Sequence, residues 1–240
     1  MLNKLKETLR VKPTKNFTEV DKAFLFSDEY ESLMAAHLPF PGTYDIHEAQ
    51  NQTKNFLYRH HEVNDQLGIF RWRGLQKHKK LIYDTVSASK SNVIDLGGAA
   101  SPLGLNSTIV DFLPKDIWGR KVSYKYIQDF PEAVDVVFTS HTLEHIVNLE
   151  EVVKDVHTKL EQNGKIIVHL PSFFCERWRV GVHVNKRYND HSWDFGLSGT
   201  EHPSTLENYL DIDTLLAKYF DLKIVEFCGD DSIFIVGEKK

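Results

Sequence analysis

The chain has 240 residues, which is enough for one domain with a sizeable core, or for one domain with a cap. Its formal charge of −5 provides no basic surface for nucleic acid or an anionic membrane. Only two cysteines occur and neither lies in a CxxC motif, which argues against a disulfide framework or a structural zinc site. The sequence holds no apolar run near the roughly 20 residues of a membrane span, and no signal-peptide core. We therefore expect a cytoplasmic protein that binds neither nucleic acid nor membrane.

Residues 1–90 show no regular alternation of strands and helices, and Pro39 and Pro41 interrupt them. This pattern predicts a mostly helical N-terminal extension or cap. Its last part, residues 76–87, is predicted to form a helix that leads into the main domain, residues 91–240.

From residue 92 onward, short runs of β-branched and aromatic residues predict a series of strands, at 92–96, 108–112, 124–127, 134–139 and 165–170. Before the last of these strands, apolar residues at helical spacing predict a helix over residues 149–160 that ends at Asn163-Gly164. Strands that alternate with helices indicate an α/β fold with a parallel sheet.

The end of the chain follows another pattern. A helix is predicted over residues 212–220, followed by strands over 222–228 and 232–237 that Gly229-Asp230-Asp231 joins as a hairpin. Residues 171–210 contain no clear strand and are rich in aromatic residues and histidines. A long irregular segment inside a compact domain is typical of a functional loop, so we expect an insertion that forms a lid over a substrate.

The first strand ends at Asp95 and continues into Gly97-Gly98. A dinucleotide-binding fingerprint would need glycines where Ala99 and Pro102 stand, and no Gly-Lys-Ser/Thr follows, so a P-loop is also excluded. Two interpretations remain: a turn that passes closely under a ligand, or an ordinary turn between strand and helix.

Acidic residues follow the next two predicted strands. Asp111 can accept hydrogen bonds from the hydroxyls of a ribose, and Asp129 can reach an adenine amino group. Each could equally be a solvated turn aspartate. Because these acids follow successive strands, together with Asp95 they favour a nucleoside site at the carboxyl edge of the sheet.

The segment DVVFTSHTLEHI, residues 135–146, brings Ser140 and His141 to the end of a strand. His141 is the first candidate for a general base, because a neutral imidazole can take a proton near pH 7. Further candidates for this role are His145, His183 and His191. The HExxH order is absent and the histidines of the long segment match no ligand spacing, so no metal site is predicted.

Several motifs together resemble class I S-adenosylmethionine-dependent methyltransferases, in the branch called methyltransferase type 11. They are VIDLGG, IVDF, QDF, DVVFTSHTLEHI and LEQNGKIIVHLP. The resemblance implies a Rossmann-like, mostly parallel seven-stranded sheet with an antiparallel last strand. One departure is Ala99, which replaces a glycine of the usual loop. Another is the link of residues 97–107, which has room for one helical turn at most before the second strand.

The resemblance also implies a cofactor site for S-adenosylmethionine. Asp95, Gly97, Gly98 and the adjoining Ala99 would line its methionine part, and Asp111 would bind its ribose. Around the adenine and the sulfonium the resemblance implies Phe112 or Leu113, Asp129 with Phe130, and Ser140 with His141.

The function that follows from the resemblance is methyl transfer to the hydroxyl or amine of a small or carbohydrate-like acceptor, under the lid of residues 171–210. Two alternatives remain open. The shortened loop suits a non-catalytic or degenerate binding module of the same fold, whereas an NAD-dependent oxidoreductase would need the missing glycine fingerprint. Aromatic residues outside the core are also compatible with a homodimer.

Overall fold

The computed structural model describes residues 73–240 except for 101–102, 104–106, 117–120, 183–189 and 230. Most of the predicted N-terminal extension therefore lies outside the described residues. Its last part forms a 3-10 helix, Arg73–His78, and helix α6, Lys79–Ser87, which confirms the helix predicted there. No helix in the described part of the chain is both long enough and apolar enough to cross a membrane.

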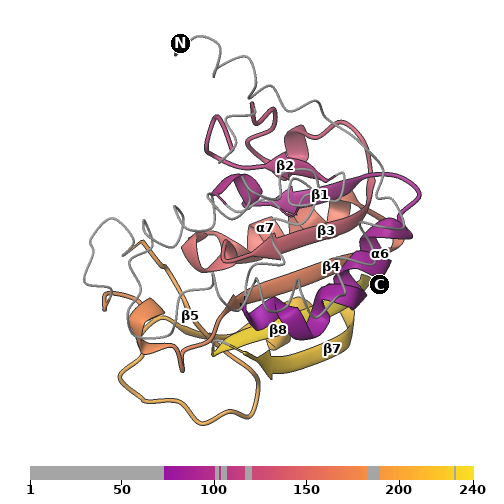
Figure 1. Ribbon diagram of the computed structural model, residues 1–240. Helices are drawn as coiled ribbons and strands as arrows, with labels where there is room; N and C mark the ends of the chain where they lie inside the picture. Colours follow the sequence, from indigo (N-terminus) through magenta and orange to yellow (C-terminus); the bar gives the residue numbers. More distant parts are fainter. Residues whose placement is uncertain (1–72, 101–102, 104–106, 117–120, 183–189, 230) are drawn as a thin grey trace, which may run out of the picture.

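Among the described residues, the central sheet has six strands in the order β2-β1-β3-β4-β8-β7 (Figure 1). Strands β2, β1, β3 and β4 are parallel, and β8 runs antiparallel to both of its neighbours. Strand β1 spans Val93–Leu96, β2 spans Thr108–Val110 and β3 spans Val134–Ser140. Strand β4 spans Leu160–Pro171, β7 spans Phe220–Cys228 and β8 spans Ser232–Lys239. The predicted mostly parallel sheet with an antiparallel C-terminal hairpin is confirmed.

Residues 124–127 do not form the strand that was predicted there. Tyr124 continues the sheet beyond β2 through a single parallel bridge to Val110, at the place of the expected seventh strand. The chain then turns into a 3-10 helix, Ile127–Asp129. The Asp129 carboxylate accepts a hydrogen bond from the backbone N–H of Tyr126, which favours this turn over an extended strand.

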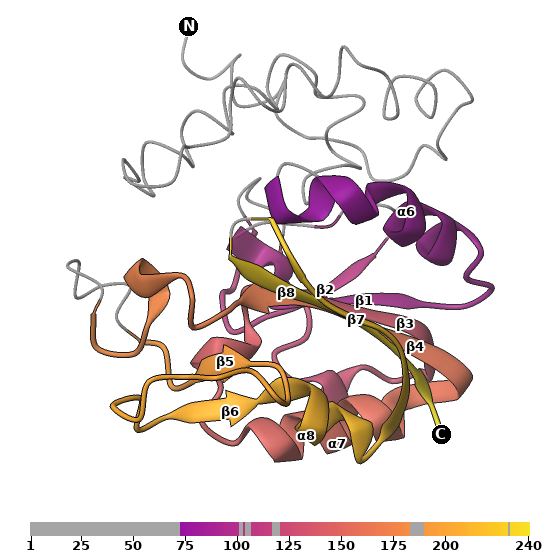
Figure 2. The same cartoon turned by 90° about the horizontal axis from the view of Figure 1, so that it is seen from below.

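Helices cover both faces of the sheet, with α6 on one side and α7 (Leu149–Lys159) and α8 (Ile212–Ala217) on the other (Figure 2). Helix α7 ends at Lys159, so the prediction that Asn163-Gly164 ends it is wrong. These two residues lie within β4, where the pairing with β3 shifts register. Asn163 has a φ of 64°, a left-handed backbone that asparagine tolerates and that suits such an irregularity.

Residues 171–210 contain two strands that the sequence did not predict. Strands β5 (Asp194–Gly196) and β6 (Tyr209–Asp211) pair in parallel as a small separate sheet. A bridge between Ser172 and Phe195 attaches this sheet to the end of β4. Three-residue strands are too short to give an alternating pattern, which explains why sequence periodicity missed them.

Candidate functional site

Three predicted site segments meet at the carboxyl edge of the sheet. Leu96 at the end of β1 is paired with Val110 on β2 and with Thr139 on β3. Because these strands are parallel and in register, the residues that come next, Gly97, Asp111 and Ser140, lie at the same edge. This is where open α/β folds bind ligands.

The turn after β1 is closely packed. Gly97 has a φ of +80°, and a Cβ on it would overlap the side chain of Thr142. A Cβ on Gly98 would overlap the Asp95 carboxylate, which is buried and accepts a 2.6 Å hydrogen bond from the backbone N–H of Leu103. Residues 98–100 form a 3-10 turn, which is the helical structure in the described part of this link. Both glycines are therefore explained by the fit of the turn itself.

Asp111 connects the turns that follow β1 and β2. One carboxylate oxygen accepts the backbone N–H of Ala99 at 2.9 Å, and the other accepts that of Leu113 at 2.8 Å. A carboxylate offers about four lone-pair positions, so these two bonds leave acceptor capacity for hydroxyl groups of a ligand. Asp111 thus has a structural role that does not prevent a binding role.

An exposed apolar surface adjoins Asp111. Phe112 is 66% exposed and Leu113 is 50% exposed. The Phe112 ring packs edge-on against Tyr126, with 5.4 Å between centroids, and Lys125 Nζ lies 5.1 Å from the Phe112 centroid. Phe130, by contrast, lies in the hydrophobic core, so the structure does not bring it to this surface as the sequence suggested.

The carboxyl end of β3 contacts His169, a buried histidine of β4 that the sequence analysis missed. Ser140 Oγ lies 2.9 Å from His169 Nδ1, and the backbone N–H of His141 donates to the His169 carbonyl at 2.8 Å. Burial lowers the pKa of His169 well below its ordinary value, so this ring is neutral near pH 7. A histidine inside the apolar run IIVHLP was the available signal.

His141 adopts a left-handed backbone with φ of 51°, and its Nδ1 lies 3.4 Å from Glu144 Oε1. Glu144 is fully buried in the turn after β3. Burial by itself raises a carboxyl pKa, but contact with His141 and the charges of nearby histidines outweigh it, so the pKa of Glu144 lies below its ordinary value. This arrangement can orient the imidazole and stabilise its protonated form.

Of the three other predicted histidines, the structure describes two, His145 and His191. His145 and His191 lie beside each other with ring centroids 4.6 Å apart. Burial lowers the pKa of His191, while the Glu144 charge opposes that effect. His183 lies outside the described residues.

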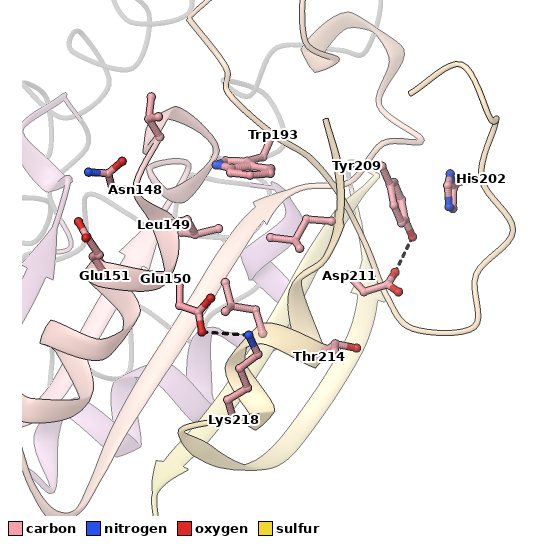
Figure 3. Close-up of a pocket in the computed structure, with 13 residues that line it drawn as sticks. Asn148, Leu149, Glu150, Glu151, Trp193, His202, Tyr209, Asp211, Thr214 and Lys218 are labelled. Carbon is pink, nitrogen blue, oxygen red and sulfur yellow. Dashed lines mark hydrogen bonds and ion pairs between the residues drawn. The ribbon is translucent and has the colours of Figure 1, made fainter. Parts of the chain in front are cut away.

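A cavity of about 640 Å³, which the sequence analysis did not identify, lies where α7 and α8 begin (Figure 3). Trp193 on its wall donates a 2.7 Å hydrogen bond from Nε1 to the Ile146 carbonyl. On another wall, His202 stacks on Tyr209, whose hydroxyl donates to Asp211 at 2.7 Å. The cavity adjoins the turn that carries Glu144, because Ser192 and Trp193 both donate backbone hydrogen bonds to the Glu144 carbonyl. Its lining combines aliphatic, aromatic and acidic side chains with Lys218.

No protein-family model matches the chain, and no curated protein matches it. Among solved structures, one similar protein is the N-methyltransferase NodS from Bradyrhizobium japonicum WM9 in complex with S-adenosyl-L-homocysteine. It has 15% identity and a TM-score of 0.46, over 89% of this chain and 99% of that chain. An S-adenosylmethionine-dependent methyltransferase from Clostridium acetobutylicum ATCC 824 has 12% identity and a TM-score of 0.48, over 76% and 98%. These descriptions apply to those proteins. The strand order and reversed last strand of the present chain agree with the class I methyltransferase fold that its sequence predicted.

Proposed function

We propose that the protein is an S-adenosylmethionine-dependent methyltransferase. The observation that carries the proposal is the meeting of Gly97, Asp111 and Ser140-His141 at one carboxyl edge, through the shared register of β1, β2 and β3. A nucleoside needs hydroxyl acceptors and an apolar face for its base. Asp111 and the exposed Phe112 offer these side by side.

The residues present fit the cofactor in its nucleoside part. Asp111 would accept the ribose hydroxyls with its remaining lone pairs, and Phe112 or Leu113 would cover the adenine. Asp129 is exposed at the next turn, within the same edge region, and is proposed for the adenine amino group. Gly97, Gly98 and Ala99 would line the methionine part beside the buried Asp95.

The bound cofactor supplies an activated methyl group for in-line displacement. The protein must orient a nucleophile and remove its proton when it carries one. We assign proton removal to His141, at the strand end next to Ser140. Glu144 would hold the His141 ring through the 3.4 Å contact and stabilise the imidazolium that forms.

We propose a small or carbohydrate-like acceptor that carries a hydroxyl or an amine. The support is the cavity next to the Glu144 turn, whose Trp193 and Tyr209 rings suit an apolar or sugar face. Residues 171–210 would act as the lid, since they supply both rings. We retain the cytoplasm as the proposed compartment, on the cysteine content of the sequence alone.

The cofactor proposal is tested by calorimetric titration with S-adenosylmethionine and, separately, with NAD. We expect S-adenosylmethionine to bind and NAD not to bind. Replacement Asp111→Asn removes the charge that accepts the ribose hydroxyls, so the Kd should rise by about 10- to 100-fold, as expected for one or two hydrogen bonds to a charged group.

Asp213→Asn is the matched control. Asp213 also accepts two hydrogen bonds, from Ser198 N and Oγ at 2.8 and 2.5 Å, but it lies on α8 and is not among the residues assigned to the cofactor. Its replacement should leave the Kd unchanged. Binding of NAD instead would favour an oxidoreductase, and binding of neither ligand would favour a non-catalytic module. Either result overturns the proposal.

A further inference from the structure

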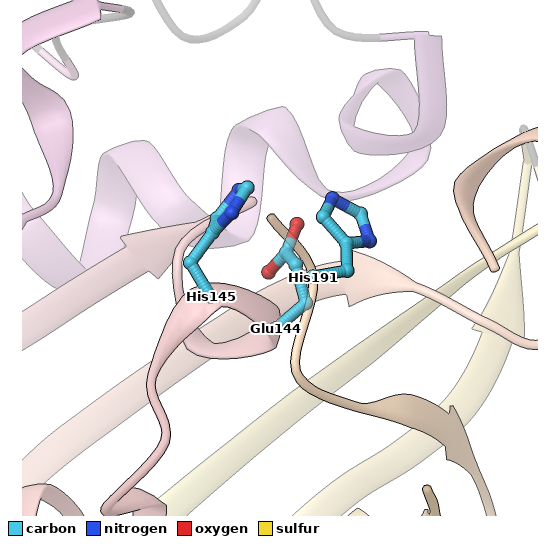
Figure 4. Close-up of side chains that lie close together, drawn as sticks. All are labelled: Glu144, His145 and His191. Carbon is cyan, nitrogen blue, oxygen red and sulfur yellow. The ribbon is translucent and has the colours of Figure 1, made fainter. Parts of the chain in front are cut away.

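Three side chains with metal-binding groups converge where residues 171–210 meet the turn after β3. Glu144 and His145 come from that turn, and His191 comes from the long segment. One donor atom from each lies within 4.8 Å of the others. Figure 4 shows the Glu144 carboxylate between the two imidazole rings. The spacing of these residues in the sequence did not predict this cluster, because His191 follows His145 by more than forty residues.

The Glu144 carboxylate is the unusual member of the cluster. Its side chain is fully buried, and apart from the contact with His141 neither oxygen has a hydrogen-bond partner among the described residues. His141 Nδ1 lies 3.4 Å from Oε1. A buried carboxylate needs compensating positive charge, and its place between two imidazoles lets a bound cation supply that charge together with the histidine contacts.

Both histidines have the outer contacts that metal ligands usually show. His145 Nδ1 lies 3.0 Å from Asp190 Oδ1, which leaves Nε2 for a ligand role. His191 forms a hydrogen bond with the backbone of Trp178, while its Nδ1 is buried without a hydrogen-bond partner. Ligating histidines typically engage their second ring nitrogen with a carboxylate or a backbone carbonyl, which fixes the tautomer.

We propose that Glu144, His145 and His191 bind one divalent transition-metal ion of the zinc type. Two imidazoles and one carboxylate suit Zn²⁺ or its first-row neighbours, whereas Mg²⁺ and Ca²⁺ prefer oxygen ligands. Ligands at about 2.1 Å around a tetrahedral ion lie about 3.4 Å apart, so the three side chains close toward the ion when it binds. The fourth position is open to water or to a substrate atom.

The ion would tie residues 171–210 to the carboxyl edge of the sheet, directly beside His141. The existing contacts already prepare this link, since Ser192 N donates to the Glu144 carbonyl at 2.6 Å. The proposed site uses none of the residues assigned to the adenosyl part of the cofactor. Metal binding at this site can therefore be tested independently of cofactor binding.

The experiment is a titration of the full chain, stripped with a chelator and then dialysed, with Zn²⁺ by calorimetry. Co²⁺ in a parallel titration reports nitrogen ligation through its visible absorption, and Mg²⁺ serves as the comparison ion. We expect one equivalent of Zn²⁺ with a Kd of about 1 µM or lower, and much weaker binding of Mg²⁺. Failure of the wild-type chain to bind Zn²⁺ would overturn the proposal.

Variants locate the ion. Glu144→Gln and His191→Asn should weaken Zn²⁺ binding by about 100-fold, while Asp190→Asn, a change at an exposed residue, should weaken it by about 10-fold. The matched control is His202→Asn, a histidine of the same segment outside the cluster, which should bind as wild type. Unchanged binding by both Glu144→Gln and His191→Asn would place any ion elsewhere and refute the assignment.

Thermal unfolding provides a readout that does not depend on affinity alone. Without metal, Glu144→Gln loses the interactions with His141 and the neighbouring histidines that hold the pKa of this carboxyl below its ordinary value, so it should melt at or below the wild-type temperature. With Zn²⁺, the melting temperature of the wild type and of His202→Asn should rise, and that of Glu144→Gln should not. If Zn²⁺ stabilises Glu144→Gln as much as the wild type, the carboxylate is no ligand. Titration of the same samples with S-adenosylmethionine separates this result from the cofactor proposal.

Discussion

His141 joins several properties in a single residue. It follows β3 directly, adopts a left-handed backbone, contacts Glu144 and donates its backbone N–H to His169. A non-glycine residue in this conformation costs energy, which the surrounding structure must offset. Such strained positions occur often at functional sites, and this one lies at the edge where the reaction is proposed.

We predict that His141→Asn lowers methyl transfer to a hydroxyl or amine acceptor by about 10²- to 10⁴-fold, the usual contribution of a positioned base. Asparagine tolerates the left-handed backbone but cannot take the proton. The measurement compares turnover and S-adenosylmethionine affinity, and the affinity should change little. His157→Asn on α7, a half-buried histidine away from the edge, is the control. Equal turnover in wild type and His141→Asn would remove His141 from the mechanism.

At the scale of elements, the start of the turn between β1 and β2 shows how close packing determines the positions of its glycines. The side chains of Thr142 and Asp95 leave no room for a Cβ at Gly97 and Gly98. The Asp111 carboxylate accepts a hydrogen bond from the backbone N–H of Ala99 and so stabilises the 3-10 turn. The motif glycines thus support the proposed site by allowing two strand ends to approach each other.

Replacement of Gly97 by alanine should destabilise the fold more than the same change at Gly199. Both glycines have a φ of +80°, so both changes carry the backbone cost of about 1–2 kcal/mol. At Gly199 nothing lies within 4 Å of the added Cβ, whereas at Gly97 it overlaps Thr142, which adds about 1–3 kcal/mol. Urea unfolding measures the difference, and equal losses would contradict the described packing.

Sequence patterns predicted the elements whose burial is regular. Helix α7 and the strands β1, β3, β7 and β8 were expected within a few residues, because each is long enough to show a period or ends at a turn signal. The patterns failed where distant contacts decide. Tyr124 makes one bridge instead of a strand, and β5 and β6 exist because they pair with each other.

The candidate site was predictable only in part. Asp95 and Ser140 lie in the last part of β1 and β3, and Asp111 and His141 directly follow β2 and β3, so parallel pairing alone brings them together. Phe130 was misplaced because an aromatic residue after an acid can face either the core or a ligand. The cluster of Glu144 with His191 depends on how residues 171–210 fold back, and no local pattern carries that information.

At the scale of the whole molecule, buried histidines make stability depend on pH. Burial lowers the pKa of His169 and His191. It also lowers the pKa of His78 and His157, which are less deeply buried. In the unfolded chain a histidine titrates near pH 6.5. Below that pH the unfolded state therefore binds protons that the folded state does not, which lowers the free energy of unfolding.

We predict that the free energy of unfolding falls as the pH is lowered from about 7 to 5.5, with a slope of about 1.4 kcal/mol per pH unit for each histidine that stays neutral. His169→Gln should reduce that slope by up to one histidine's share. Urea unfolding in the presence of a chelator, at several pH values, measures both. A slope that is the same in His169→Gln would show that this ring is not the group responsible.

The reversed direction of β8 has a practical consequence for such measurements. Glu238 pairs with Lys165 near the start of β4, so the chain reaches Lys240 on the side of the sheet opposite the carboxyl edge. An affinity label or surface anchor attached after Lys240 would leave the fold on that opposite side. Immobilised protein would then present the ligand edge to the solution, which makes surface-based binding assays suitable for this molecule.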